Sequence, residues 1–128
     1  MGTKGTARPR RVGGVDRALY FNPSCSKCRT ADSLLREKGV EAHQVRYLDT
    51  APTVDELRLL MRKLGIDDPR GMMRTGEAVY SELSLDEASP DKLLEAITNH
   101  PILLERPILV VGDRAVIARP PERVLELL

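Results

Sequence analysis

The chain has 128 residues, of which 30% are charged and 41% hydrophobic, which suits one domain with its own hydrophobic core. No apolar run approaches the roughly 20 residues that a membrane span requires, so we expect a soluble protein without a membrane partner. Residues 15–128 carry a net charge of −3 within the total of +1, which argues against a nucleic-acid-binding domain because its surface should be basic.

The first 14 residues predict a flexible basic tail that precedes a folded domain over residues 15–128. The tail is rich in Gly, Pro, Lys and Arg, and it contains no acid. It also has no apolar segment of the kind that a secretory signal needs. We therefore expect a cytoplasmic protein, with a monomer as the default, and we assign no function to the tail.

The first half of the domain predicts the order β-α-β-α. Residues 15–21 form a short apolar run typical of a strand, and residues 24–38 place apolar side chains on one helical face before a glycine. Residues 43–48 alternate in the manner of a second strand. Thr53 and Glu56 form a capping box that begins a helix, which we expect to end at Gly65.

The second half is less regular. Prolines and glycines interrupt residues 67–82, where only 69–74 suggest one or two helical turns, and a helix is predicted over residues 89–99. Two β-rich runs, 107–111 and 114–118, flank a Gly-Asp hairpin signal, and residues 120–128 resemble a short helix. A βαβ unit, a helical middle and a ββα unit predict a thioredoxin-like fold with a four-stranded mixed sheet between helices.

Both cysteines of the chain lie in the segment "NPSCSKC", where the first strand gives way to the first helix. Cys25 should lie at the helix N-terminus, where backbone N–H groups and the helix dipole lower a thiol pKa, with Lys27 and Arg29 adding positive charge. Cys28 lies one turn further in and is a candidate resolving thiol. A C-x-x-C beside a βαβ pattern therefore predicts a redox pair.

Two other interpretations of the pair stay open. The two cysteines could instead be inert, buried side chains that only pack at the helix start. A zinc site would need four ligands, whereas the chain adds only His43 and His100, neither at a suitable spacing, so we expect no metal.

Arginines beside prolines or turns recur in "MMRTGE", "LLERPILVV" and "IARPPERVL". They are Arg74, Arg106 and Arg119. A guanidinium donates two hydrogen bonds to an oxyanion and keeps its charge, so these residues could bind an anion if they converge. Taken singly, each is also consistent with an ordinary surface arginine.

The segments "NPSCSKCRTADSLL", "YLDTAPTVDEL", "GMMRTGEAVY", "HPILLERPILVV" and "ARPPERVLELL" together resemble the glutaredoxin-coupled arsenate reductase family over roughly residues 17–128. The resemblance implies that Cys25 attacks arsenate, and that Arg74, Arg106 and Arg119 bind the oxyanion and the arsenylated intermediate. It also implies a thioredoxin-like fold with an inserted helical subdomain, and a cis peptide bond before Pro107.

The implied reaction has no bound cofactor. The Cys25 thiolate would form a thiol-arsenate adduct, a second thiol would reduce As(V) to As(III), and arsenite would leave. In the familiar version the electrons come from glutathione with glutaredoxin. Cys28, thioredoxin or mycothiol are open alternatives.

Two positions depart from the pattern of that family. Phe21 stands where many members have a histidine before Asn-Pro, so the helix terminus, Lys27 and Arg29 would have to ionise Cys25 without it. Cys28 stands where those members have a serine, which resembles the Spx-type transcription regulators. In these, a C-x-x-C redox switch accompanies binding to RNA polymerase. The three-arginine set favours the reductase, because a polymerase-binding switch has no evident use for it.

Overall fold

The computed structural model describes residues 11–12 and 15–128. In chain order its elements are β1 (Arg11–Val12), β2 (Val15–Tyr20), α1 (Ser26–Glu37), β3 (His43–Val45), α2 (Val54–Leu64), η1 (Pro69–Met72), α3 (Ala78–Glu82), η2 (Leu85–Glu87), α4 (Pro90–Asn99), η3 (Pro101–Leu103), β4 (Ile108–Val111), β5 (Arg114–Ile117) and η4 (Pro121–Leu127), where η denotes a 3-10 helix.

The predicted four-stranded mixed sheet is confirmed, in the order β3-β2-β4-β5. β2 pairs in parallel with β3 and antiparallel with β4, and β4 pairs antiparallel with β5. In this register Tyr20 lies opposite Val45 on one side and opposite Ile108 on the other. The ends of β2 and β3 and the start of β4 therefore lie at one edge of the sheet, where the loops that follow them can meet.

A fifth strand was not predicted. Arg11 and Val12 form β1, which pairs antiparallel with the first two residues of β2. Arg11 and Val12 precede the predicted boundary and pair with β2, and the boundary after residue 14 stays a prediction. Composition alone pointed to a tail because two such residues are too short to show a strand pattern. Residues 1–10 and 13–14 of the predicted tail lie outside the described part of the chain.

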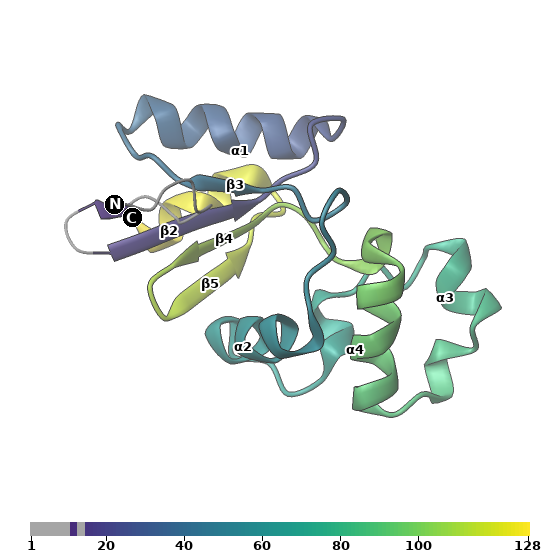
Figure 1. Ribbon diagram of the computed structural model, residues 1–128. Coiled ribbons are helices and arrows are strands. Elements are labelled where there is room, and N and C mark those ends of the chain that lie inside the picture. Colours follow the sequence, from purple (N-terminus) through teal and green to yellow (C-terminus); the bar gives the residue numbers. More distant parts are fainter. Residues whose placement is uncertain (1–10, 13–14) are drawn as a thin grey trace, which may run out of the picture.

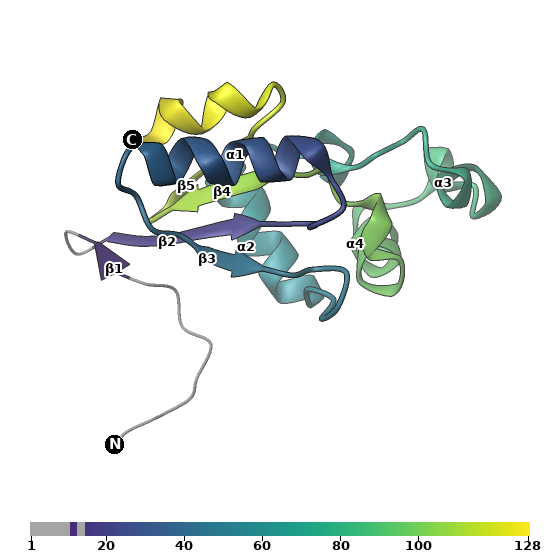
Figure 2. The same cartoon turned by 90° about the horizontal axis from the view of Figure 1, so that it is seen from above.

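Helices cover both faces of the sheet (Figure 1). α1 and η4 lie side by side on one face, as Figure 2 shows from above. α2 lies on the opposite face. Alternation along the strands supplies both cores: Leu109 packs with the α1 side, whereas Ile108 and Val110 pack with the α2 side.

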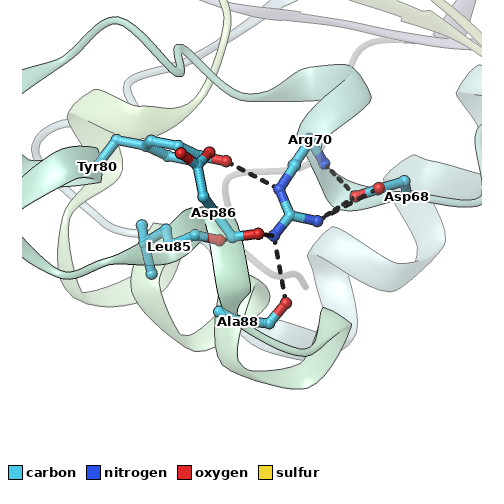
Figure 3. Close-up of polar contacts among 6 residues, drawn as sticks. All are labelled: Asp68, Arg70, Tyr80, Leu85, Asp86 and Ala88. Carbon is cyan, nitrogen blue, oxygen red and sulfur yellow. Dashed lines mark hydrogen bonds and ion pairs between the residues drawn. The ribbon is translucent and has the colours of Figure 1, made fainter.

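The helical segments between β3 and β4 form the expected inserted subdomain, with α3 and α4 beside the end of the sheet (Figure 1). Its irregular part is held by Arg70 (Figure 3). The Arg70 guanidinium donates to the Tyr80 hydroxyl at 2.8 Å and to the carbonyl oxygens of Leu85, Asp86 and Ala88 at 2.6, 2.9 and 3.3 Å. One side chain thus replaces the backbone pairing that a turn-rich segment lacks.

Local sequence signals account for the two longer helices of this subdomain. Thr53 Oγ1 accepts from the Glu56 N–H at 3.1 Å, and a Glu56 carboxylate oxygen accepts from the Thr53 N–H at 2.7 Å, which confirms the capping box. Gly65 ends α2 with φ of 73°, a left-handed conformation that glycine adopts without strain. The Ser89 hydroxyl caps α4 by accepting from the Lys92 N–H.

Two predicted elements differ from the structure. The second strand ends at Val45, not at residue 48, because the Tyr47 N–H turns back to donate to the Val45 carbonyl at 3.0 Å. The C-terminal helix is 3-10 in type, with prolines at positions 120 and 121 at its start. Within the described residues, no helix is both long and apolar enough to cross a membrane.

Candidate active site around Cys25

The loop between β2 and α1 is shaped by Asn22. Its Oδ1 accepts from the Ser24 N–H at 3.0 Å, and its carbonyl oxygen accepts from the Cys25 N–H at 2.9 Å. Arg29 fastens the same loop from the helix side, because its Nη1 donates to the Pro23 carbonyl oxygen at 2.7 Å. These contacts fix the conformation of the loop and so the position of Cys25 at the start of the helix.

Cys25 is the N-cap residue of α1, and it is half-buried with an extended backbone conformation. Partial burial acts to raise the pKa of its thiol. The backbone N–H of Cys28, the Cys28 thiol, the Arg106 side chain and the backbone N–H of Lys27 outweigh that effect, so the pKa is lowered. The sulfur therefore favours the thiolate form, as a nucleophile at a helix N-terminus should.

Cys28 has the opposite character. It is fully buried in the cluster on the α1 side of the sheet, and burial raises the pKa of its thiol to about 11. The hydrogen bond to Cys25 and the charge of Cys25 also contribute to this increase, while Asn22 and Arg106 act in the opposite direction. The structure thus places a protonated thiol beside an ionisable one, and Cys28 stabilises the Cys25 thiolate by hydrogen bonding.

Arg106 reaches the nucleophile from the start of β4. The peptide bond between Arg106 and Pro107 is cis, as the family resemblance implied, and the one between Arg119 and Pro120 is also cis. The Arg106 side chain lies near enough to Cys25 to lower the pKa of its thiol. Its Nε and Nη1 are buried and have no partner among the described residues. Such donors are costly to leave unpaired, which indicates that an acceptor belongs beside them.

Arg74 and Arg119 lie around Glu105. The Arg74 Nη1 and the Arg119 Nε each lie 3.9 Å from Glu105 Oε1, and the Arg74 Nε donates to Glu77 at 3.0 Å. The Arg119 Nη1 donates to the Arg106 carbonyl oxygen at 2.9 Å. All of these side chains are partly buried. The three arginines are therefore linked, and Arg106 is the one whose side chain lowers the pKa of Cys25.

The backbone explains how Arg74 comes near Arg106. The Arg74 N–H donates to the Leu103 carbonyl at 2.7 Å, and the Glu105 N–H donates to the Met72 carbonyl at 2.9 Å. Met73 and Leu104 form an isolated antiparallel bridge between these bonds. The segment that follows η1 is thereby paired with the segment that leads into β4.

Sequence reasoning missed two residues of this region, Tyr47 and Glu105. Tyr47 is fully buried, and its pKa responds to the charges of Arg106, Cys28, Cys25 and Arg74. The sequence places it in the strand predicted over residues 43–48, where the alternation carries no functional signal. Glu105 is visible in the sequence beside Arg106, but its contacts with two distant arginines are not.

Some other expectations changed with the structure. Lys27 acts on Cys25 through its backbone N–H, and the guanidinium of Arg29 donates to the Pro23 carbonyl. Phe21 is buried in the α1-side core, and the Arg46 guanidinium lies 5.6 Å above its ring.

His43 is a residue of strand β3, and His100 follows α4. Over residues 11–12 and 15–128, no group of three or more His, Cys, Asp or Glu could hold a metal ion.

Comparison with known proteins identifies the family of the chain. An arsenate reductase of Neisseria meningitidis is 47% identical over 108 residues, which are 83% of this chain and 92% of that protein. An arsenate reductase of Haemophilus influenzae is 47% identical over 112 residues, 86% of this chain and 97% of that one. The solved arsenate reductase of Vibrio cholerae superposes with a TM-score of 0.85 at 44% identity, covering 88% of this chain and 97% of that chain. The pattern of the ArsC family matches residues 20–127, and the chain belongs to that family.

Proposed function

We propose that this protein reduces arsenate to arsenite with electrons from thiols, and that Cys25 is the nucleophile. The observation that supports this most directly is the pair Cys25 and Arg106: a thiol with a lowered pKa beside a guanidinium whose Nε and Nη1 are buried without partners. A thiolate attacks an anion only if nearby positive charge offsets their repulsion. The names of relatives at 47% identity support arsenate as the anion.

In the first step, arsenate binds to Arg106, with Arg74 and Arg119 supplying further positive charge. The Cys25 sulfur donates an electron pair to arsenic, a sulfur–arsenic bond forms, and one arsenate oxygen leaves as water after gaining protons. Arsenic stays As(V) in this step. The charge of the guanidinium groups is needed throughout because the adduct remains anionic.

In the second step, another thiol attacks the Cys25 sulfur. The sulfur–arsenic bond breaks, its electron pair stays on arsenic, and As(III) leaves as arsenite. Cys25 remains in a disulfide with the attacking sulfur, and a further thiol reduces that disulfide. In sum, arsenic acid and two thiols give arsenous acid, a disulfide and water. Glutathione with glutaredoxin is the external donor that we propose.

Cys28 is the internal candidate for the second thiol. Its raised pKa makes Cys28 a poor nucleophile while Cys25 is a thiolate. Burial is the largest cause of the increase, and the hydrogen bond and charge of Cys25 add to it. Both effects disappear once Cys25 is bonded to arsenic. Cys28 would therefore become easier to ionise at the stage at which a resolving thiol is needed.

The test is arsenate-dependent NADPH oxidation with wild type, Cys25→Ser and Cys28→Ser. Each is assayed with glutathione, glutaredoxin and glutathione reductase, and separately with thioredoxin and its reductase. We expect wild type to turn over and Cys25→Ser to be inactive. Loss of activity in Cys28→Ser with both donor systems would identify Cys28 as the resolving thiol, and full activity would assign that role to the external thiol. Absence of wild-type turnover with every donor would refute the reductase.

A redox-switched binding protein is the second candidate, favoured by the contact between the two cysteine thiols. Such a protein would form a Cys25–Cys28 disulfide with mild oxidants, show no arsenate-dependent turnover, and bind RNA polymerase in one redox state only. A pull-down with purified RNA polymerase, using reduced and oxidised protein, separates this function from the reductase. Both candidates require free thiols, as the structure has, and a reducing compartment such as the cytoplasm would maintain them.

A further inference from the structure

Tyr47 is fully buried, yet its hydroxyl has no hydrogen-bond partner among the described residues. A buried hydroxyl without a partner costs free energy, because it has lost its hydrogen bonds to water. Phenylalanine would fill the same space without that cost. The hydroxyl therefore calls for an explanation other than packing.

Tyr47 follows β3 at the end of the sheet where the nucleophile loop follows β2. Tyr20 lies opposite Val45 of β3 and Ile108 of β4. Two residues further along, β3 leads to Tyr47 and the antiparallel β4 is preceded by Arg106. Tyr47 and Ile108 pack in the same core cluster, on the α2 side of the sheet. Tyr47 and Arg106 thus flank the end of β2 from its two neighbouring strands.

The charges around the hydroxyl match this placement. Burial raises the pKa of Tyr47; the positive charge of Arg106 lowers it, Cys28 and Cys25 raise it, and Arg74 lowers it again. The groups that act on Tyr47 are therefore the nucleophile, its neighbouring thiol and two of the three arginines. The net increase keeps the hydroxyl protonated at neutral pH, so it is available as a neutral donor.

We propose that the Tyr47 hydroxyl is a substrate-binding donor, which gives a hydrogen bond to one oxygen of the tetrahedral oxyanion that Arg106 binds. The proposal rests on the function proposed above. It explains three buried polar atoms together, since the Arg106 Nε, the Arg106 Nη1 and the Tyr47 hydroxyl all lack partners. Arsenate offers several acceptor oxygens in different directions, so it can satisfy donors from both flanks of β2 at once.

The experiment measures binding separately from chemistry. Arsenate is titrated into Cys25→Ser, and into the same protein with Tyr47→Phe, with Kd followed by NMR chemical shifts. The matched control is Tyr20→Phe in the same background. Tyr20 is a neighbouring tyrosine, with 6.4 Å between the two ring centroids, and burial and the charge of Glu56 raise the pKa of its hydroxyl. We expect Tyr47→Phe to raise Kd by roughly 10-fold or more, as for a lost hydrogen bond to a charged group, and Tyr20→Phe to leave it unchanged.

The other results are distinguishable. An unchanged Kd in Tyr47→Phe, or an equal increase in both tyrosine variants, would overturn the role of Tyr47 and leave the reductase standing if wild type turns over. A Tyr47-specific increase without wild-type turnover would establish the oxyanion site and refute the reductase. If Cys25→Ser binds no arsenate and wild type is inactive, both proposals fail. The NMR spectra and melting temperature of each variant show whether it is folded.

Discussion

Arg119 donates a hydrogen bond from its Nη1 to the carbonyl oxygen of Arg106, at 2.9 Å. One of the three arginines thereby orients the backbone of another, immediately before the cis bond to Pro107. Arg106 is in turn the arginine whose side chain lowers the pKa of Cys25. The arginines therefore have different roles: Arg106 acts on the nucleophile, and Arg119 holds the backbone of Arg106.

The first prediction concerns Arg106→Lys. Lysine keeps the charge but loses the planar fork and most of its donors, so the Cys25 thiolate and bound arsenate both lose hydrogen bonds. We expect kcat/KM for arsenate to fall by roughly 10- to 100-fold, the range for hydrogen bonds to charged groups. The pH at which iodoacetamide alkylates Cys25 should also rise. Arg123→Lys, in an exposed pair with Glu126, is the control, and equal effects in both variants would contradict the assignment.

The second prediction concerns the pH dependence of stability. The pKa of Cys25 is lower in the folded protein than its ordinary value of 9.0, so the thiol loses its proton at a lower pH in the folded chain than in the unfolded chain. The Cys25 contribution is present above pH 9 and is lost as the pH falls through the lowered pKa. The pKa of Cys28 is raised to about 11, so its contribution is present below pH 9 and is lost toward pH 11.

Urea unfolding from pH 6 to 11 measures both contributions. The free energy of unfolding of wild type relative to Cys25→Ser should rise with pH up to about 9. Relative to Cys28→Ala it should fall above about 9. A flat difference in either comparison would mean that the corresponding thiol has the same pKa in the folded and unfolded chain.

The third prediction concerns Glu105→Gln. The Glu105 carboxylate lies between Arg74 and Arg119 and offsets part of the positive charge that an oxyanion should meet. Glutamine keeps the shape and removes the charge, so we expect KM for arsenate to fall by roughly 2- to 5-fold at low salt, the scale of a partly exposed ion pair. The effect should shrink as salt is added. A higher KM would show instead that Glu105 serves mainly to hold the two arginines in place.

The fourth prediction concerns Arg70→Ala. The variant leaves the Tyr80 hydroxyl and the carbonyls of Leu85 and Ala88 without their donor, so we expect a clearly lower melting temperature. Arg58→Ala is the matched control, because Arg58 forms an exposed pair with Asp91, and it should melt close to wild type. The Arg70 contacts would be unimportant for stability if both variants melted alike.

Much of the fold could be predicted from local signals. The capping box at Thr53, the serine cap of α4 and the Gly-Asp hairpin between β4 and β5 all act over a few residues, and each is visible in the sequence. The position of Cys25 at a helix start follows from the same kind of signal. The irregular middle could not be assigned, because Arg70 holds it through contacts up to 18 residues away in the chain.

The residues of the candidate site also differ in whether the sequence could indicate them. The family resemblance pointed to Arg74, Arg106 and Arg119, but no local pattern shows that Glu105 lies between two of them. Tyr47 was hidden because a tyrosine after a strand is ordinary in a buried sheet. Its position relative to Arg106 depends on the register of β3 and β4 against β2, which sequence periodicity does not reveal.

The short antiparallel pairing of residues 72–74 with residues 103–105 would link the proposed anion binding to local stability. Two backbone hydrogen bonds join the segment that contains Arg74 to the segment that leads to Arg106. If these two bonds opened, Arg74 would separate from Arg106 while β2, β4 and β5 stayed paired. An oxyanion held from both sides would act as a third tie, so saturating anion should slow amide hydrogen exchange at this junction more than in the sheet.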